Sequence, residues 1–223
     1  MNNRIHLIKV LLVLFITTTI KVSAQEAAPF FNEVQELSKK YDSIWDNTKE
    51  TIIFTGSSSI RMWKNLPALF PKYQILNTGF GGSQASDLLY YLDDLVLKYN
   101  PKKVFIYEGD NDIFAKKKPK EVVLTTEQII ARIKQTDPTV TIVLLSTKPS
   151  LSRWKLRGKY KKLNRKLRRL TLKDESLAFV DVWTPMLDGK KVKNDIFISD
   201  GLHMNQKGYD LWYMAIKDFV NNP

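Results

Sequence analysis

Short apolar runs alternate regularly along the sequence with stretches of helical periodicity. The apolar runs are rich in Val, Ile, Leu and Phe, as is usual for strands that are buried on both faces. The expected strands are residues 51–55, 74–77, 103–107, 139–145 and 177–182, and the expected helices are residues 29–47, 84–99, 119–136, 152–172 and 206–220. Strands that alternate with helices predict right-handed crossovers and helices on both sides of a parallel sheet. We therefore expect a three-layer α/β/α sandwich around a five-stranded parallel sheet.

Small and polar residues follow the first three expected strands directly. These segments are residues 56–59, 79–83 and 109–112, and each contains at least one glycine. The carboxyl ends of parallel strands meet at one edge of the sheet, where open α/β sheets bind their ligands. We therefore expect the three segments to come together and to form a site.

The N-terminus predicts export. Two cations flank the start of an apolar run over residues 10–16, and small residues lead up to Ala24. This pattern is typical of a signal peptide, here residues 1–24, and the run is short and threonine-rich for a membrane span. We expect a single mature domain over residues 25–223, periplasmic or extracellular, with no stable membrane span after cleavage. An uncleaved N-terminal anchor is the alternative.

The chain contains no cysteine and few histidines, which limits its possible chemistry. Without cysteine it can form neither disulfides nor thiolate nucleophiles. Of the two histidines, His6 lies in the predicted signal peptide, so His203 is the one imidazole that the mature chain would retain. Catalytic zinc usually takes several nitrogen or sulfur ligands, so the sequence does not favour a metal site, and we expect no cofactor.

His203 stands three residues after Asp200, just before the last expected helix. At this spacing the carboxylate can reach Nδ1 of the ring, which would fix the tautomer and stabilise the imidazolium. A surface histidine near a helix start is the alternative interpretation. The pattern alone does not decide between the two.

The segments after the strands offer a hydroxyl and hydrogen-bond donors. A serine in the turn Gly56-Ser57-Ser58-Ser59 can project its hydroxyl from the edge of the sheet. Gly82 can offer an unobstructed N–H, and Asn111 carries an amide that can donate to an oxyanion. Each also has a structural interpretation, because serines cap helices, glycines end strands and asparagines form turns.

Taken together, the four segments resemble the SGNH hydrolases, also called GDSL esterases and lipases. The matching blocks are Gly56-Ser-Ser-Ser59, Asn77-Thr-Gly-Phe-Gly-Gly82, Gly109-Asp-Asn-Asp112 and Asp200-Gly-Leu-His203. The resemblance implies a flavodoxin-like fold, in agreement with the layering predicted above. It also implies a serine nucleophile at Ser58, a base at His203 oriented by Asp200, and an oxyanion hole made by the Ser58 and Gly82 N–H groups and the Asn111 side chain.

One residue departs from the pattern of that family. Ser57 stands where the family usually has aspartate, so the turn lacks a charge and three serines are adjacent. Ser58 is favoured over its neighbours by register with the family block.

The resemblance predicts a serine esterase that forms an acyl-enzyme, and the N-terminal pattern predicts that it is exported. Exported single-domain members of the family favour a short acyl group such as acetyl, on a small-molecule or carbohydrate ester. A lysophospholipase or thioesterase type of acylhydrolase is one alternative. A non-catalytic module that binds a glycan or a polyanion is another. The sequence assigns no oligomeric state.

A basic stretch over residues 153–173 carries eleven Lys or Arg and no acid. The whole chain has a net charge of +12. Such an excess is compatible with binding a nucleic acid, an acidic polysaccharide or an anionic lipid. Leucines and a tyrosine recur every three to four residues, however, which predicts a helix with one apolar face and a solvated basic face. Aromatic residues that would stack on bases are sparse, so nucleic acid is not favoured.

Overall fold

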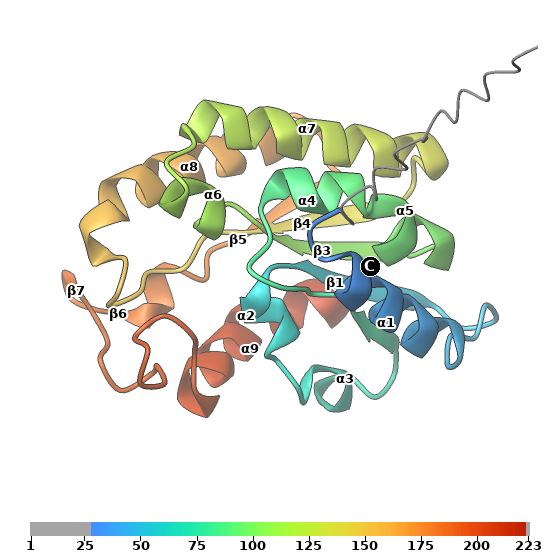
Figure 1. Ribbon diagram of the computed structural model, residues 1–223, viewed down its shortest axis with the longest axis horizontal. Coiled ribbons are helices and arrows are strands. Elements are labelled where there is room, and N and C mark those ends of the chain that lie inside the picture. The colour runs from blue at the N-terminus through green and yellow to red at the C-terminus, as the bar shows by residue number, and fades with distance from the viewer. Residues whose placement is uncertain (1–27, 222–223) are drawn as a thin grey trace, which may run out of the picture.

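All five expected strands form one parallel sheet in the computed structural model, which describes residues 28–221 (Figure 1). The strands are β1 (Thr51–Gly56), β2 (Gln74–Asn77), β3 (Lys103–Tyr107), β4 (Thr141–Leu145) and β5 (Leu177–Val180). Their order in the sheet is β2-β1-β3-β4-β5, and every neighbouring pair is parallel. The predicted fold class is therefore confirmed. The predicted signal peptide, residues 1–24, lies outside the described residues.

Helices cover both faces of the sheet. They are α1 (Phe31–Asp42), α2 (Ser58–Arg61), α3 (Leu66–Leu69), α4 (Ala85–Tyr90), α5 (Leu92–Leu95), α6 (Asp110–Phe114), α7 (Pro119–Thr136), α8 (Arg157–Thr171) and α9 (Gln206–Asn221), with short 3₁₀ turns at Leu97–Tyr99, Trp154–Leu156 and Thr184–Met186. In Figure 1, α7 and α8 lie over one face of the sheet and α3 and α9 lie over the other. The core is accordingly divided into two apolar clusters, one on each side of the sheet.

Alternate residues of each strand supply the two clusters. Ile53 and Val104 face the layer that contains α7 and α8, whereas Phe54 and Phe105 face the layer that contains α9. Phe54 and Phe105 are register partners on adjacent strands, and their rings stack with centroids 4.2 Å apart. The near-continuous apolar sequence of the strands is thus explained by burial on both faces.

Local sequence signals set the bounds of α7. Pro119 occupies the first turn, where its missing N–H removes no helical hydrogen bond, and Glu121 accepts a hydrogen bond from the Lys118 N–H. The helix ends at Thr136, two residues before Pro138.

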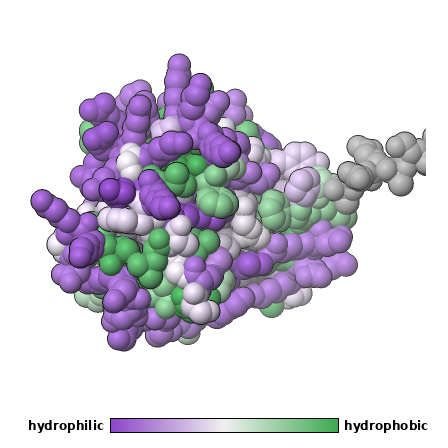
Figure 2. Space-filling model, turned by 60° about the vertical axis from the view of Figure 1, so that its left-hand side comes forward, coloured by the Kyte–Doolittle hydropathy of each residue, from purple (hydrophilic) through white to green (hydrophobic). Residues whose placement is uncertain are grey.

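The basic helix α8 has the apolar face that its sequence predicts. Its buried leucines and tyrosine pack against the sheet and α7, while most of its cations lie on the solvent side. The buried residues of that face are Tyr160, Leu163, Leu167 and Leu170. In Figure 2 the side of the molecule that carries α8 is largely hydrophilic, with hydrophobic residues in smaller areas.

Some elements differ from the sequence prediction. The helix expected over residues 84–99 is divided into α4, α5 and a 3₁₀ turn. The break falls at Tyr91, whose hydroxyl donates to the Pro29 carbonyl at 2.7 Å and whose ring packs edge-on against Phe80. A small hairpin, β6 (Leu187–Asp188) with β7 (Lys191–Val192), was not predicted. Among the described residues, no helix is both long and apolar enough to cross a membrane.

The direction in which successive strands are added to the sheet reverses between β1 and β3. From β1 the chain moves outward to β2, and then it crosses back to β3 and continues to β5. Ligand sites of open α/β sheets lie at such a switch point, beyond the carboxyl ends of the strands. Two of the polar segments singled out in the sequence follow β1 and β3 at this point.

Candidate active site

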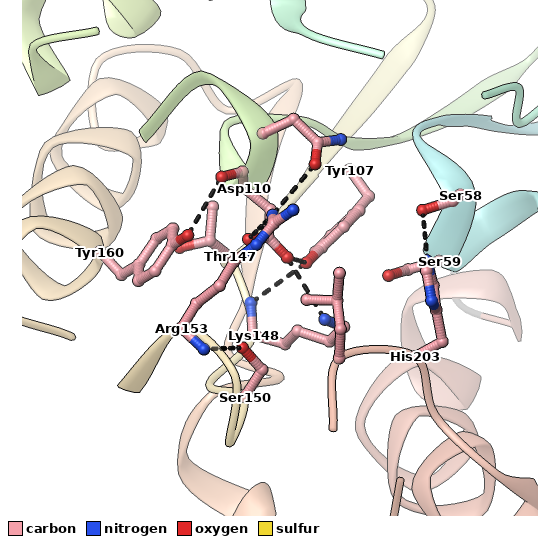
Figure 3. Close-up of polar contacts among 12 residues, drawn as sticks. Ser58, Ser59, Tyr107, Asp110, Thr147, Lys148, Ser150, Arg153, Tyr160 and His203 are labelled. Carbon is pink, nitrogen blue, oxygen red and sulfur yellow. Dashed lines mark hydrogen bonds and ion pairs between the residues drawn. The ribbon is translucent and has the colours of Figure 1, made fainter. Parts of the chain in front are cut away.

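Ser58 and His203 meet at the carboxyl edge of the sheet. Ser58 is the first residue of α2, directly after β1, and its Oγ lies 2.8 Å from Nε2 of His203. The two residues are 145 positions apart in the sequence. A hydroxyl at this distance from an imidazole can pass its proton to the ring as it attacks a carbonyl carbon. In Figure 3 this pair lies on one side of a second group of polar residues.

Asp200 holds His203 from the opposite side of the ring. Its Oδ2 lies 2.6 Å from Nδ1 of His203, while its Oδ1 accepts the N–H groups of Leu202 at 2.8 Å and His203 at 2.9 Å. Burial opposes ionisation, but these hydrogen bonds outweigh it and lower the pKa of Asp200 to about 2. The carboxylate therefore remains ionised at neutral pH and orients the ring with Nε2 toward Ser58.

A close approach of two strand ends places Ser58. Gly56 ends β1 with φ +121°, and a Cβ there would lie 2.1 Å from the carbonyl oxygen of Tyr107 at the end of β3. A residue with a side chain therefore fits neither the conformation nor the space. The next residue, Ser57, donates its N–H to that same Tyr107 oxygen at 3.1 Å, which fixes the turn into α2.

The neighbours of Ser58 take no part in the contact with His203. Ser57 and Ser59 are both buried, and the Ser59 carbonyl accepts the hydroxyl of Tyr209 at 2.9 Å. Ser57 precedes α2 without making a side-chain cap. Of the three adjacent serines, Ser58 is thus the one that the fold brings against the imidazole.

Gly82 and Asn111, from the segments after β2 and β3, lie next to each other. A Cβ added to Gly82 would be 3.8 Å from Nδ2 of Asn111, and Gly82 is exposed. Nδ2 donates to the Ser83 carbonyl at 2.9 Å, and Oδ1 accepts from Nη1 of Arg153 at 3.0 Å. Together with the N–H of Ser58, which opens a helix and so lacks an intrahelical partner, these groups can donate to a developing oxyanion.

A buried ionic cluster lies behind Asn111. Asp110 accepts the Lys148 ammonium at 3.3 Å and the Tyr107 hydroxyl at 3.0 Å on Oδ2, and Arg153 at 2.8 Å on Oδ1 (Figure 3). The Tyr160 hydroxyl donates to its main-chain carbonyl at 3.1 Å. Burial favours the neutral acid, but the charges of Lys148 and Arg153 lower the pKa of Asp110 to about 2. Burial also lowers the pKa of Lys148 despite its carboxylate partner.

A second buried carboxyl supports the glycine segment. Glu108 follows β3 and accepts the Ser83 hydroxyl at 2.7 Å, next to Gly82. Burial, reinforced by the charge of Asp112, raises the pKa of Glu108 well above its usual range. Asp112 in turn accepts the Ala85 N–H at 3.1 Å, at the start of α4. Both carboxyls therefore position the backbone around Gly82.

The pKa of Glu108 leads to a stability prediction. We expect Glu108→Gln to increase the free energy of unfolding, and the increase should grow as the pH rises above about 4.3. Above that pH the Glu108 carboxyl is ionised in the unfolded chain, whereas burial keeps it protonated in the folded protein. The stabilising contribution of Glu108 is therefore complete below the unfolded pKa and is lost as the pH rises through the folded one. Glutamine keeps an acceptor for Ser83 and does not titrate.

Urea unfolding at several pH values between 4.5 and 8 measures this difference, with a slope of at most about 1.4 kcal/mol per pH unit. Glu175→Gln, at an exposed carboxylate, is the matched control. If the free energies of unfolding of Glu108→Gln and the wild type change in parallel with pH, Glu108 is ionised in the folded protein.

Other residues near the site in sequence have structural roles. Trp63 and Phe80 are fully buried in the core, and Arg61 forms an ion pair with Glu33 at 3.2 Å. Sequence reasoning missed Lys148 and counted Arg153 among the surface cations. A charged residue soon after a buried strand was the available signal for Lys148, whereas nothing distinguished Arg153 from the ten other cations of the basic stretch.

Comparisons with known proteins identify the family and the fold. The chain matches the model of a family described as GDSL-like lipase/acylhydrolase over residues 42–211. It is similar to a protein from Streptococcus pneumonia whose description names platelet activating factor, with 26% identity, a TM-score of 0.73 and coverage of 85% of this chain and 93% of that one. A search of curated proteins found no match.

Two further solved structures are esterases by description. A carbohydrate esterase family 3 protein from Talaromyces cellulolyticus has 15% identity and a TM-score of 0.64, with coverage of 77% of this chain and 96% of that one. An acetyl-xylooligosaccharide esterase from Geobacillus Stearmophilus has 16% identity and a TM-score of 0.65, with coverage of 78% and 95%. At these identities the likeness concerns the fold.

Proposed function

We propose that Ser58, His203 and Asp200 form the catalytic triad of this chain. The chain belongs to the GDSL-like lipase/acylhydrolase family and is a serine ester hydrolase. The observation that carries the proposal is the continuous chain of contacts from Asp200 through His203 to Ser58, with distances of 2.6 and 2.8 Å. The same three groups in this order serve acyl transfer on unrelated folds.

The proposed reaction passes through an acyl-enzyme. Nε2 of His203 takes the proton of Ser58 as Oγ attacks the ester carbonyl carbon. The N–H groups of Ser58 and Gly82 and the amide of Asn111 donate to the oxyanion that forms. His203 then gives its proton to the leaving alcohol, and water activated by the same imidazole hydrolyses the acyl-enzyme.

We propose a short acyl group such as acetyl, on a carbohydrate alcohol, as the substrate class. Support comes from the descriptions of two similar folds, a carbohydrate esterase and an acetyl-xylooligosaccharide esterase. A screen of the purified protein on acyl esters of increasing chain length and on acetylated xylo-oligosaccharides tests this. Preference for a lysophospholipid or a long-chain thioester would replace this substrate class with the corresponding alternative.

Covalent labelling tests the nucleophile independently of the substrate. We expect a fluorophosphonate probe to form one adduct on the folded protein, on the peptide that contains Ser58, as mapped by mass spectrometry. The reaction requires the imidazole that activates the hydroxyl, so His203→Ala should slow labelling by at least about 100-fold. Absence of labelling in the folded wild type, or labelling that is unchanged in His203→Ala, would contradict the proposed triad.

Export remains a proposal that rests on the sequence of residues 1–24 alone. N-terminal sequencing of the protein recovered from the periplasm or the culture medium of a bacterial expression host tests it, since cleavage after Ala24 would give Gln25 as the first residue.

A further inference from the structure

The side chain of Arg153 lies in the candidate active site and not on the basic surface. It belongs to the stretch of eleven cations that leads into α8, yet its side chain is only 10% exposed. Its guanidinium lies over the ring of Phe114, 4.3 Å from the centroid. One nitrogen, Nη1, lies 2.8 Å from Oδ1 of Asp110 and 3.0 Å from Oδ1 of Asn111. Arg153 therefore connects Asp110 of the buried ionic cluster, shown in Figure 3, to Asn111, the side chain proposed to bind the oxyanion.

The contacts of Asn111 permit one orientation of its amide. An arginine side chain has only donors, so Oδ1 of Asn111 must face it. The carbonyl of Ser83 is only an acceptor, so Nδ2 must face that side, at 2.9 Å. A rotation of the amide by 180° would oppose donor to donor and acceptor to acceptor. One N–H of Nδ2 is thus taken by Ser83, and the direction of the other is fixed by the same amide plane. Nδ2 itself lies 3.8 Å from the position that a Cβ on Gly82 would occupy.

Arg153 is itself held firmly. Its partner Asp110 also accepts Lys148, which is fully buried, and the hydroxyl of Tyr107. Tyr160 of α8 donates to the Asp110 carbonyl. Each group in this chain of contacts has a fixed partner on another element, so the guanidinium has little freedom to move away from Asn111. Preorganised donors are effective in catalysis because they need no reorientation during the reaction.

We propose that Arg153 is a positioning residue for ester hydrolysis, because it holds the Asn111 amide with its N–H toward the oxyanion. This inference rests on the proposed function. Arg153 touches neither Ser58 nor His203 in the structure, so its effect is expected through Asn111. An oxyanion forms only in the transition state, so loss of Arg153 should lower kcat while KM stays nearly unchanged.

The central experiment compares Arg153→Met, Asn111→Ala and the double variant. Removal of an oxyanion donor usually lowers kcat about 100- to 1,000-fold, and we expect this for Asn111→Ala. For Arg153→Met we expect a decrease of about 10- to 100-fold, since the amide remains but is no longer held. In the Asn111→Ala background, Arg153→Met should change kcat less than about threefold, because the group on which it acts is gone.

Two variants separate positioning from charge and folding. Arg153→Lys can still donate to Oδ1 of Asn111 and should recover part of kcat. Arg157→Met removes an exposed cation of the same basic stretch, at the start of α8, and should retain wild-type kcat and KM. Circular dichroism and thermal unfolding establish that each variant is folded. If Arg153→Met does not fold, the same cycle with Arg153→Lys and Asn111→Ala serves as the test.

The outcomes distinguish this inference from the function on which it rests. Wild-type kcat in folded Arg153→Met, or a full 10-fold loss that persists in the Asn111→Ala background, overturns the positioning role. If Ser58→Ala retains the activity, the proposed triad itself is wrong. An inactive Ser58→Ala protein with a fully active Arg153→Met protein rejects only the role of Arg153.

Discussion

We expect Ser58→Ala to lower kcat for a chromogenic acetate ester by about 10⁶-fold, with an unchanged circular dichroism spectrum. Losses of this size follow when the nucleophile of a triad is removed, since the oxyanion donors then act without a covalent intermediate. The substitution removes one oxygen from a side chain whose contact is with His203, so the fold does not depend on it. Single-turnover and steady-state assays of the purified variant measure the effect.

Ser57→Ala and Ser59→Ala are the matched controls, because both remove a buried hydroxyl from the same turn. Each should retain kcat to within about 10-fold, since neither hydroxyl lies against the imidazole. If Ser59→Ala loses the activity and Ser58→Ala keeps it, the nucleophile is Ser59, and the rotation of α2 differs in the active protein.

Asp110→Asn is expected to have the largest effect on stability. The substitution keeps the shape of the side chain but removes the single negative charge that faces both Lys148 and Arg153. Lys148 and Arg153 would both lose the carboxylate with which they form ion pairs. Breaking a buried ion pair by removing one partner costs about 3–5 kcal/mol. Urea unfolding at pH 7 should show a decrease of this size in the free energy of unfolding.

The pH dependence and a double variant identify the cause. The pKa of Asp110 is lowered to about 2 in the folded protein, so its contribution is present above the unfolded value of about 3.9 and is lost as the pH falls toward 2. The wild type and Asp110→Asn should therefore converge in acid. Asp110→Asn combined with Lys148→Met removes one cation as well and should recover part of the lost stability. A decrease below about 0.5 kcal/mol at pH 7 for Asp110→Asn would contradict this account.

The strands were predictable because each is a short apolar run that ends at a small or polar residue. That pattern follows from burial on both faces, and it locates the carboxyl edge where Ser58 and Asn111 lie. The pairing of Asp200 with His203 was predictable because three residues in a loop suffice for the contact. The order β2-β1-β3-β4-β5 then brings the separate segments together.

The residues behind the site were not predictable in the same way. Arg153 has ten cationic neighbours in the basic stretch, and its inward direction depends on Asp110, a residue 43 positions away. Glu108 gave no signal either, because its pKa depends on burial beneath Ser83 and next to Asp112. Contacts of this kind are set by tertiary packing, and neither periodicity nor local spacing encodes them. The short helices α2 and α6 were missed since one turn leaves no period to detect.

The separation of Ser58 from His203 has a consequence for the synthesis of the enzyme. The proposed oxyanion donors Ser58, Gly82 and Asn111 lie in the first half of the sequence, whereas the proposed base, His203, lies just before α9. A ribosome-bound chain that has not yet released α9 contains Ser58 and the His203 loop but lacks the helix that packs beside them. The Tyr209 hydroxyl of α9 donates to the Ser59 carbonyl. We therefore expect the contact between Ser58 and His203, and with it ester hydrolysis, only after α9 has packed against the sheet.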